Sequence, residues 1–292
     1  MKLTSRAPVR IDFAGGWTDV PIFAESAGGA VLNAAVAQYV YGEMETGQDG
    51  NGIRVSYNSD LPAGSGLGTS SALNVVWLSL VQSRISSRED KERIAELAYN
   101  LESVLGILGG KQDQYAAALG GINLMRFTDK VTVESVELDD QAVTELETRL
   151  VLCYTGQSRL SGNIHDNVWG AFRAGKNETV RALYRIREIA VLMTDALRHS
   201  EWERFGGLLQ ENWENQKCLD ASVTNERIET LFELARGNGA IGGKAGGAGG
   251  GGCLVFFAEK GRSTELTDAL SATGVRIIPC KLDFQGLTIS RE

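Results

Sequence analysis

The segment LPAGSGLGTSSAL, residues 61–73, restricts the fold of this chain more than any other segment. It contains Gly64, Gly66 and Gly68, then three hydroxyl side chains, and an apolar stretch with helical spacing follows. Glycines let successive backbone N–H groups converge on an anion, and a helix that begins there adds its positive N-terminus. The segment therefore predicts a loop that binds phosphate oxygens. The alternative is a glycine turn before a helix capped by its own hydroxyl groups.

The commonest phosphate-binding motifs fit this segment poorly. A Walker A loop places Lys directly before its Ser or Thr, whereas Gly68 precedes Thr69 here. The dinucleotide fingerprint and the protein-kinase glycine loop both need a third glycine at position 69. The chain also has no HRD or DFG sequence. The loop therefore predicts phosphate binding outside the commonest nucleotide folds.

Composition narrows the class of protein and its partners. The chain has 292 residues, 43% of them hydrophobic, which is enough for a large core in one or two domains. A net charge of -8 without Lys/Arg clusters disfavours a nucleic-acid surface, so small-molecule partners are expected. The sequence starts without the apolar core of a signal peptide, and no segment is long enough to cross a bilayer. We expect a cytoplasmic protein with no membrane or nucleic-acid partner.

Cysteine and histidine are too sparse for most metal or nucleophile chemistry. The four cysteines lie far apart and form no CxxC pair, so reduced and mostly buried thiols are expected. Only His165 and His199 are available to a metal centre or a Ser-His-Asp site. Catalysis is therefore expected to depend on carboxylates.

The hydrophobic pattern predicts a mixed α+β protein, because strand-like and helix-like periodicities occur without regular βαβ alternation. The best boundary lies near Leu150, and it divides the chain into residues 1–150 and 151–292 with an extensive shared interface. The expected strands are residues 3–13, 31–45, 53–57, 121–127, 131–136, 150–154, one near Ala240, 253–258, 275–280 and one that ends near Ser290; the expected helices are residues 70–83, 90–105 and 263–271, with a helical region over 164–237.

Glu102 and Asp113 are the carboxylates most suited to catalysis near this loop. They are eleven residues apart, almost three turns of an unbroken helix, although Gly109 and Gly110 interrupt the pattern. Metal-assisted phosphoryl transfer requires one carboxylate on a magnesium ion and one that orients or deprotonates the acceptor hydroxyl. The alternatives are a solvated helix glutamate for Glu102 and a helix-start carboxylate for Asp113.

Three motifs resemble those of the GHMP kinase family, named for galactokinase, homoserine kinase, mevalonate kinase and phosphomevalonate kinase. PAGSGLGTSSA, residues 62–72, resembles the second family motif PxxxGLGSSA, with Thr69 for the first Ser and one extra hydroxyl. Residues 7–19 resemble the first motif, and residues 242–252 resemble the third, GAKxxGAGGGG. The resemblance implies a two-domain GHMP kinase fold, with an N-terminal ribosomal-protein-S5-like domain and a C-terminal ferredoxin-like α/β domain.

The same resemblance implies an ATP site formed by the second and third motifs. Asp113 would be the catalytic base with Arg10 beside it, and Ser70 with Glu102 would bind Mg²⁺ on the ATP phosphates. The glycine density of the third motif lets two backbones touch, so a packed active-site loop is expected there rather than a linker. The implied ATP-binding residues are Pro62, Gly64, Ser65, Gly66, Leu67, Gly68, Thr69, Ser70, Ser71, Gly247 and Gly249.

The first motif resembles the sugar-specific branch of the family. Asp19 lies nine positions after Arg10, and the galactokinase motif GRVNLIGEHTD has the same spacing between its Arg and its final Asp. The resemblance implies that Asp19 binds sugar hydroxyls. Asp12, Gly16 and Trp17 depart from that motif, which has Asn, Glu and His there, and these departures argue against galactose as the acceptor. The resemblance still implies that Gly16 and Trp17 contact the substrate. Trp17 either stacks on a pyranose ring or plugs the loop against the core.

Two groups of sugar 1-kinases share segments with the chain. RIDFAGGWTDVP resembles fucokinase-type enzymes, whereas GGKQDQYAAALGGIN and YTGQSRLSG resemble D-glycero-D-manno-heptose 7-phosphate kinases. If the acceptor carries a phosphate, Lys111 or Arg159 would meet it, unless these are solvated surface charges. The resemblance thus implies an ATP- and magnesium-dependent sugar 1-kinase, monomeric or homodimeric, with heptose 7-phosphate as the leading acceptor. The alternatives are a fucokinase-type enzyme, a non-catalytic sugar and ATP sensor, and an amino-alcohol or isoprenoid kinase.

Overall fold

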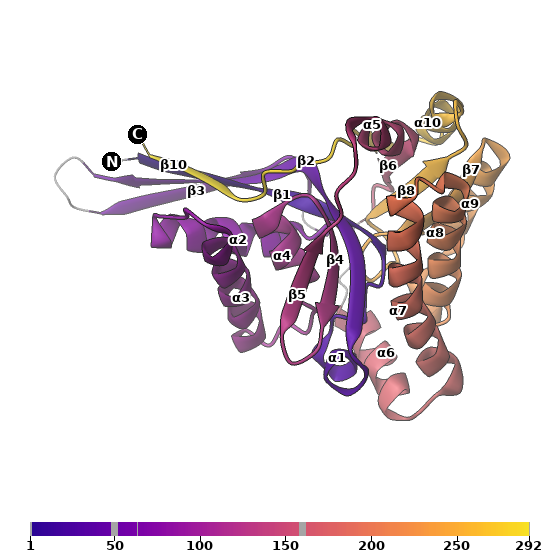
Figure 1. The fold of residues 1–292 in the computed structure, drawn as a ribbon, viewed down its shortest axis with the longest axis horizontal. Coiled ribbons are helices and arrows are strands. Elements are labelled where there is room, and N and C mark those ends of the chain that lie inside the picture. Colours follow the sequence, from indigo (N-terminus) through magenta and orange to yellow (C-terminus); the bar gives the residue numbers. More distant parts are fainter. Residues whose placement is uncertain (1, 48–51, 63, 158–161, 292) are drawn as a thin grey trace.

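The computed structural model describes residues 2–47, 52–62, 64–157 and 162–291 of the chain. Two antiparallel sheets and the helices that cover them form the fold (Figure 1). The larger sheet has the strand order β10-β1-β2-β4-β5, with β3 also paired to β2, and the smaller sheet has the order β7-β8-β6-β9. This mixture of sheets and helices confirms the expected α+β class. Along the described residues, no helix has the length and apolar content that a membrane span needs.

Strand β1 (Lys2–Ala14) lies inside the larger sheet and carries the first motif. Successive side chains of a strand point to opposite faces, so Arg10 and Asp12 share one face while the fully buried Ile11 lies on the other. The register between β1 and β2 (Gly29–Thr46) shifts after Asp12. Such irregularities bend a strand and redirect its side chains. Here the bend lies directly before the turn that contains Gly16 and Trp17.

The C-terminal strand returns to the larger sheet. β10 pairs with β1, so Leu3 lies opposite Arg291, and the two ends of the chain are neighbours (Figure 1). The division of the chain into residues 1–150 and 151–292 stays a prediction. β10 belongs to the range 151–292, yet it pairs with β1 in the larger sheet. The remaining strands of this sheet are β3 (Ile53–Ser59), β4 (Ile122–Phe127), β5 (Val131–Ser135) and β10 (Thr288–Arg291).

Three helices cover one face of the larger sheet: α2 (Thr69–Gln82), α3 (Arg88–Val104) and α4 (Gln112–Leu119) (Figure 1). Their apolar side chains form one core with the sheet, in which Val76 and Ala116 are fully buried. This packing brings the first turns of α2 and α4 next to each other, which positions the glycine loop beside Asp113.

A second core continues from the larger sheet to the smaller one. It joins Ile11 of β1 to Leu152 of the smaller sheet through Met193 and Phe205, which lie on two long helices. The halves of the chain therefore share an extensive apolar interface. The two helices are α7 (Asn177–Arg198) and α8 (Trp202–Lys217), and the smaller sheet contains β6 (Leu150–Tyr154), β7 (Ala240–Ala245), β8 (Cys253–Ala258) and β9 (Arg276–Ile278).

Most expected elements are present, and the differences concern short helices, among them α4, which was not expected. Seven residues give α1 too few turns for a periodic pattern, and α5 is recognisable mainly by its N-cap Asp139, which accepts a hydrogen bond from Ala142 N. The helical region expected over 164–237 consists of several separate helices. The other unexpected helices are α1 (Pro21–Ala27) and α5 (Asp140–Arg149). Besides α7 and α8, the helical region contains α6 (Gly162–Arg173), the 3₁₀ helix η1 (Ala221–Val223) and α9 (Glu226–Gly237). Helix α10 (Ser263–Ser271) has the expected bounds.

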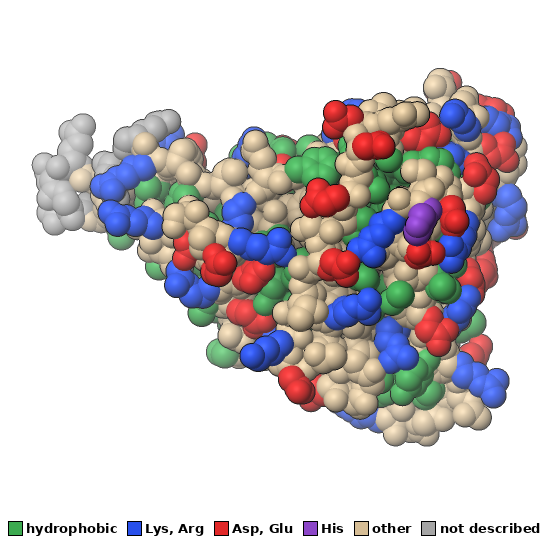
Figure 2. Space-filling model, viewed as in Figure 1, with side chains coloured by type: hydrophobic (Ala, Val, Ile, Leu, Met, Phe, Trp, Pro, Cys, Tyr) green, Lys and Arg blue, Asp and Glu red, His purple; other side chains and the backbone are tan. Residues whose placement is uncertain are grey.

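The surface in Figure 2 carries charges of both signs, interspersed over α7 and its neighbours. Arg204 pairs there with Asp195 at 3.0 Å, and Arg198 pairs with Glu134. Exposed pairs of this kind contribute little to stability. The four cysteines are free thiols: Cys153 and Cys253 are buried, and Cys218 and Cys280 are partly buried.

Candidate active site

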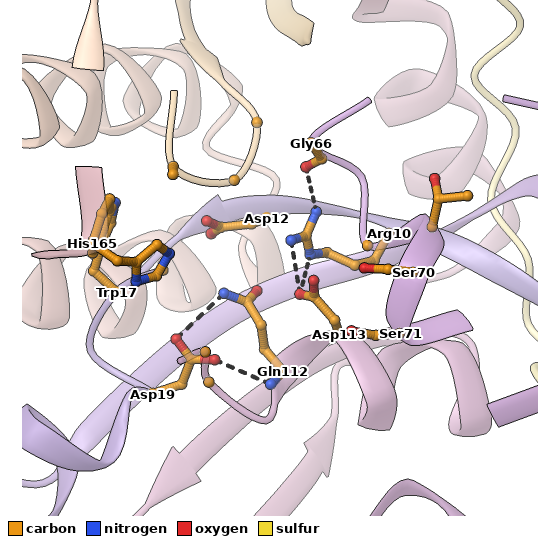
Figure 3. A pocket seen from close by; sticks show the side chains of 18 of the residues that line it. Arg10, Asp12, Trp17, Asp19, Gly66, Ser70, Ser71, Gln112, Asp113 and His165 are labelled. Carbon is orange, nitrogen blue, oxygen red and sulfur yellow. Dashed lines mark hydrogen bonds and ion pairs between the residues drawn. The ribbon is translucent and has the colours of Figure 1, made fainter. Parts of the chain in front are cut away.

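A pocket opens between the end of β1, the first turns of α2, α4 and α6, and the glycine-rich segment after β7 (Figure 3). It gathers residues from all three sequence motifs, although these lie far apart in the chain. Of the residues predicted for the site, those that line the pocket are Arg10, Gly16, Trp17, Asp19, Gly64, Ser65, Gly66, Gly68, Thr69, Ser70, Ser71, Glu102, Asp113, Gly247 and Gly249.

The glycine loop adopts a backbone that most side chains would prevent. Gly64, Gly66 and Gly68 have φ values of 74°, 77° and 77°, in the left-handed region that glycine tolerates. Gly68 is the N-cap of α2, and among the described residues no side chain makes a capping hydrogen bond at this end. The alternative of a turn capped by its own hydroxyl groups is therefore wrong. The N–H groups of the first turn and the helix dipole are available to an anion.

The third motif packs directly against this loop. A Cβ on Gly66 would lie 2.9 Å from the carbonyl oxygen of Gly246, and a Cβ on Gly252 would lie 2.7 Å from that of Ser65. The backbone N–H of Cys253 donates to the Ser65 carbonyl at 2.8 Å. Two glycine-rich backbones thus touch without side chains between them, which confirms the packed loop expected from the glycine density.

Arg10 connects the first motif, the loop and Asp113 (Figure 3). Its Nε donates to Asp113 Oδ1 at 2.7 Å, and its Nη1 donates to the Gly66 carbonyl oxygen at 2.8 Å. Asp113 Oδ2 faces the loop, because a Cβ on Gly68 would lie 3.0 Å from it. One oxygen of the Asp113 carboxylate is therefore held by Arg10, while the other lies where a group bound to the loop would meet it.

Asp19 is a buried carboxylate at the same pocket. The backbone N–H of Gln112 donates to its Oδ2 at 3.1 Å, and the Gln112 side chain donates to its Oδ1 at 3.5 Å. Burial raises the pKa of Asp19 to about 7, and the negative charges of Asp113 and Asp12 add to the increase. Gly110 leaves room for this carboxylate, since a Cβ there would lie 1.8 Å from Asp19 Oδ2.

Several groups at the pocket were not predicted, and they include Gln112, Asp12 and His165. Asp12 accepts a 2.8 Å hydrogen bond from Nζ of the fully buried Lys244, so a buried ion pair joins β1 to β7. His165 lines the pocket and lies against Trp17, with ring centroids 4.5 Å apart. Trp17 itself is buried and packs into the core that surrounds the smaller sheet, as its plug interpretation required. The alternation of Arg10 and Asp12 along β1 is the signal that points to Asp12.

Comparisons with known proteins assign this chain to a family. Residues 31–121 match the GHMP kinases N terminal domain, and residues 193–276 match the GHMP kinases C terminal domain. D-glycero-alpha-D-manno-heptose 7-phosphate kinase of Campylobacter jejuni is 30% identical, over 92% of this chain and 93% of that protein. The chain belongs to the GHMP kinase family.

Two more relatives differ in the share of their own length that matches this GHMP kinase. L-fucokinase/L-fucose-1-P guanylyltransferase of Bacteroides fragilis is 26% identical over 98% of this chain, but the match spans only 38% of that longer protein. A crystal structure titled D-glycero-D-manno-heptose 1-phosphate kinase, from Bacteroides thetaiotaomicron, superposes with a TM-score of 0.78 at 27% identity and covers 99% of each chain. The expected two-domain fold of the family is therefore confirmed.

In this GHMP kinase, Glu102 lies at the pocket but comes from a different helix than Asp113. Its buried carboxylate accepts hydrogen bonds from Asn74 Nδ2 at 2.9 Å and from Gln114 Nε2 at 2.8 Å, and burial raises its pKa. Helix α3 ends at Val104, so the two carboxylates converge through tertiary packing and not through one continuous helix.

Three predicted residues that the structure describes do not line the pocket. Lys111 is turned toward Glu96, with Nζ 2.9 Å from its carboxylate, and lies over the ring of Tyr99. Pro62 and Leu67 are not part of the lining: Pro62 is exposed, and Leu67 packs into the core. Arg159 lies outside the described residues.

Proposed function

We propose that this GHMP kinase transfers the γ-phosphate of ATP to the anomeric hydroxyl of a sugar, with D-glycero-D-manno-heptose 7-phosphate as the acceptor. The observation that carries the proposal is the contact between Asp113 and the glycine loop. The Arg10 side chain fixes both, since it bonds to Asp113 Oδ1 and to the Gly66 carbonyl. A phosphate in the loop and a hydroxyl on Asp113 would therefore be neighbours.

The proposed reaction assigns a role to each group around the loop. The N–H groups of the first turn of α2 bind the transferring phosphate oxygens. Asp113 Oδ2 accepts a hydrogen bond from the anomeric hydroxyl and takes its proton as the new O–P bond forms. The bond between the γ-phosphorus and the β,γ-bridging oxygen of ATP breaks in the same step, and ADP leaves. Arg10 keeps the carboxylate in place and offsets the negative charge that develops beside it. The product is a sugar 1-phosphate.

The residues at the pocket fit a magnesium ion carried by ATP. Within the described chain, no three His, Cys, Asp or Glu side chains come together to hold a metal. Mg²⁺ in kinases commonly takes one or two protein ligands together with phosphate oxygens and water. Glu102 and the hydroxyls of Ser70 and Ser71 would supply the protein ligands, and Ser71 is the buried member of that pair. The ion would neutralise charge on the phosphates.

The acceptor end of the pocket suits a molecule rich in hydroxyl groups. Three buried polar atoms of its lining have no partner among the described residues: the acceptors Asp12 Oδ1 and Gln112 Oε1, and the donor Trp17 Nε1. Native proteins leave few such groups unpaired. A polyol that offers both donors and acceptors would satisfy them, and Asp19 would accept two further hydroxyls from it.

A free sugar is the second candidate acceptor, because the described walls of the pocket carry little positive charge. Arg10 is paired with Asp113, and Lys111 is turned toward Glu96. The heptose 7-phosphate assignment is supported by the similarity to the Campylobacter jejuni enzyme over nearly all of the chain. On that assignment Arg159 is proposed to meet the 7-phosphate.

ADP release with a panel of hexoses, heptoses and their phosphates tests the proposed function. We expect turnover of heptose 7-phosphate, a loss of about 10²–10⁴-fold in kcat for Asp113→Asn, and unchanged kcat for the exposed control Asp268→Asn. Full activity in Asp113→Asn would refute the mechanism. Turnover of free sugars alone would select the second candidate. Binding of ATP and sugar without turnover by the wild type would indicate a sensor.

A further inference from the structure

The pocket has two distinct ends (Figure 3). Ser70 and the glycine loop form one end, and Trp17 and His165 form the other, with Gln112 and Asp113 between them. Trp17 follows β1 in the first motif, whereas His165 lies in the first turn of α6. The mechanism proposed above uses the phosphate end and the middle of the pocket, and it leaves the aromatic end without a role.

A neighbouring tryptophan fixes the tautomer of His165. Trp169 Nε1 donates to His165 Nδ1 at 3.3 Å. An indole nitrogen is only a donor, so Nδ1 must be the acceptor and the proton of the neutral imidazole must be on Nε2. Burial acts in the same direction, because it lowers the pKa of His165. The imidazole therefore offers one uncharged N–H donor, at Nε2.

Trp17 is held rigidly beside this donor. Its φ is 79°, in the left-handed region that non-glycine residues rarely occupy because it strains their backbone. The indole is almost fully buried between His165 and Trp169, with ring centroids 4.5 Å and 5.9 Å away. Its own Nε1 has no partner among the described residues. The turn thus maintains a strained residue that lines the pocket.

The charges near this wall indicate what kind of group it binds. Asp12 and Asp19 are the nearest ionisable side chains of the pocket, and both are acidic. Lys244 approaches them, but its ammonium is paired with Asp12. Acidic neighbours and a neutral imidazole disfavour a phosphate dianion at this end. They suit an uncharged hydroxyl, which accepts from His165 and donates to a carboxylate.

We propose that His165 determines acceptor specificity: its Nε2–H donates to one hydroxyl oxygen of the sugar, while Trp17 packs against the adjoining carbon atoms. This inference rests on the proposed function, because it takes the acceptor to be a sugar. A phosphate on the acceptor lies at another wall of the pocket. His165 acts as a binding residue that selects the orientation of one hydroxyl, and it does not touch the transferring phosphate.

Three variants test this role. His165→Phe retains a flat ring beside Trp17 but removes the N–H donor. His165→Gln restores an N–H near the position of Nε2. The control His199→Phe alters the only other histidine in the sequence, which is exposed at the end of α7. We expect His165→Phe to raise the KM for the sugar about tenfold, with unchanged KM for ATP and unchanged melting temperature. His165→Gln should recover part of the loss, and His199→Phe should match the wild type.

Mono-deoxy analogues of the sugar identify the contact. For one analogue, which lacks the hydroxyl bound by His165, the wild type and His165→Phe should have equal KM values. A tenfold difference that persists for every analogue would show that His165 acts on the fold alone, and it would overturn the inference. Turnover with the same sugar KM in His165→Phe and wild type would overturn it while the kinase function stands. A wild type that phosphorylates no sugar would overturn both.

Discussion

At the scale of single residues, the pocket concentrates acidic groups that folding alone does not favour. Asp12, Asp19 and Asp113 surround one cavity, and burial of charge is costly unless the charge is paired. Asp113 pairs with Arg10 and Asp12 pairs with Lys244, whereas Asp19 has only amide donors. This difference explains why the pKa of Asp19 rises to about 7. An unpaired buried carboxylate in a pocket is a feature of function more than of stability.

The first residue-level prediction concerns Asp19→Asn and pH. The ordinary pKa of Asp19 is 3.8 and the folded value is about 7, so the folded state binds the proton more tightly. The stability that this proton confers is complete below pH 4 and is lost as pH rises toward 7, by at most about 1.4 kcal/mol per pH unit. Asp19→Asn avoids this loss. Urea unfolding should therefore show a variant that gains stability over the wild type across that range, yet has a higher KM for the sugar.

The exposed Asp129→Asn is the matched control for this experiment. Its free energy of unfolding should follow the wild type at every pH. If the difference between Asp19→Asn and the wild type were the same at pH 4 and pH 8, the buried carboxylate would not be the group that titrates.

At the scale of elements, two glycine-rich loops form the phosphate end by contact of their backbones. Gly66 and Gly246 approach so closely that a Cβ on either would lie 2.9 Å from a carbonyl oxygen of the other. Neither loop is therefore free to take larger residues, and the position of each depends on the other. Since one loop begins α2 and the other connects β7 with β8, the shape of the proposed phosphate site depends on the docking of both sheets.

Gly66→Ala tests this contact. The alanine would combine the strain of a φ of 77° with a clash against Gly246. Gly274→Ala is the control, because Gly274 has a φ of 82° but no atom within 4 Å of its Cβ position. The control should lose about 1–2 kcal/mol of stability, the cost of the left-handed conformation alone. Gly66→Ala should lose more and should raise the KM for ATP about tenfold or more, and equal effects in the two variants would contradict the close approach.

At the scale of the whole molecule, local patterns predicted the fold and the phosphate end better than the aromatic end. The glycine spacing predicted the loop because backbone conformation is a local property. The family resemblance, not a local pattern, predicted that Arg10 lies beside Asp113. His165 was missed because α6 reaches the pocket only through packing against the turn after β1. The direction of Lys111 was also set by tertiary contacts, since Glu96 lies on another helix.

The last prediction concerns the ion pair between Lys244 and Asp12, which joins the smaller sheet to the larger one. Lys244→Met would leave the buried Asp12 uncompensated, so we expect a loss of about 3–5 kcal/mol in the free energy of unfolding. Adding Asp12→Asn should recover much of this loss, because the double variant has no buried charge at that point. Lys176→Met, which breaks an exposed pair with Glu178, should change stability by less than about 1 kcal/mol. Denaturant unfolding of the wild type, Lys244→Met, Asp12→Asn and the double variant completes a double-mutant cycle, and additive effects of the two buried substitutions would mean that this pair does not hold the sheets together.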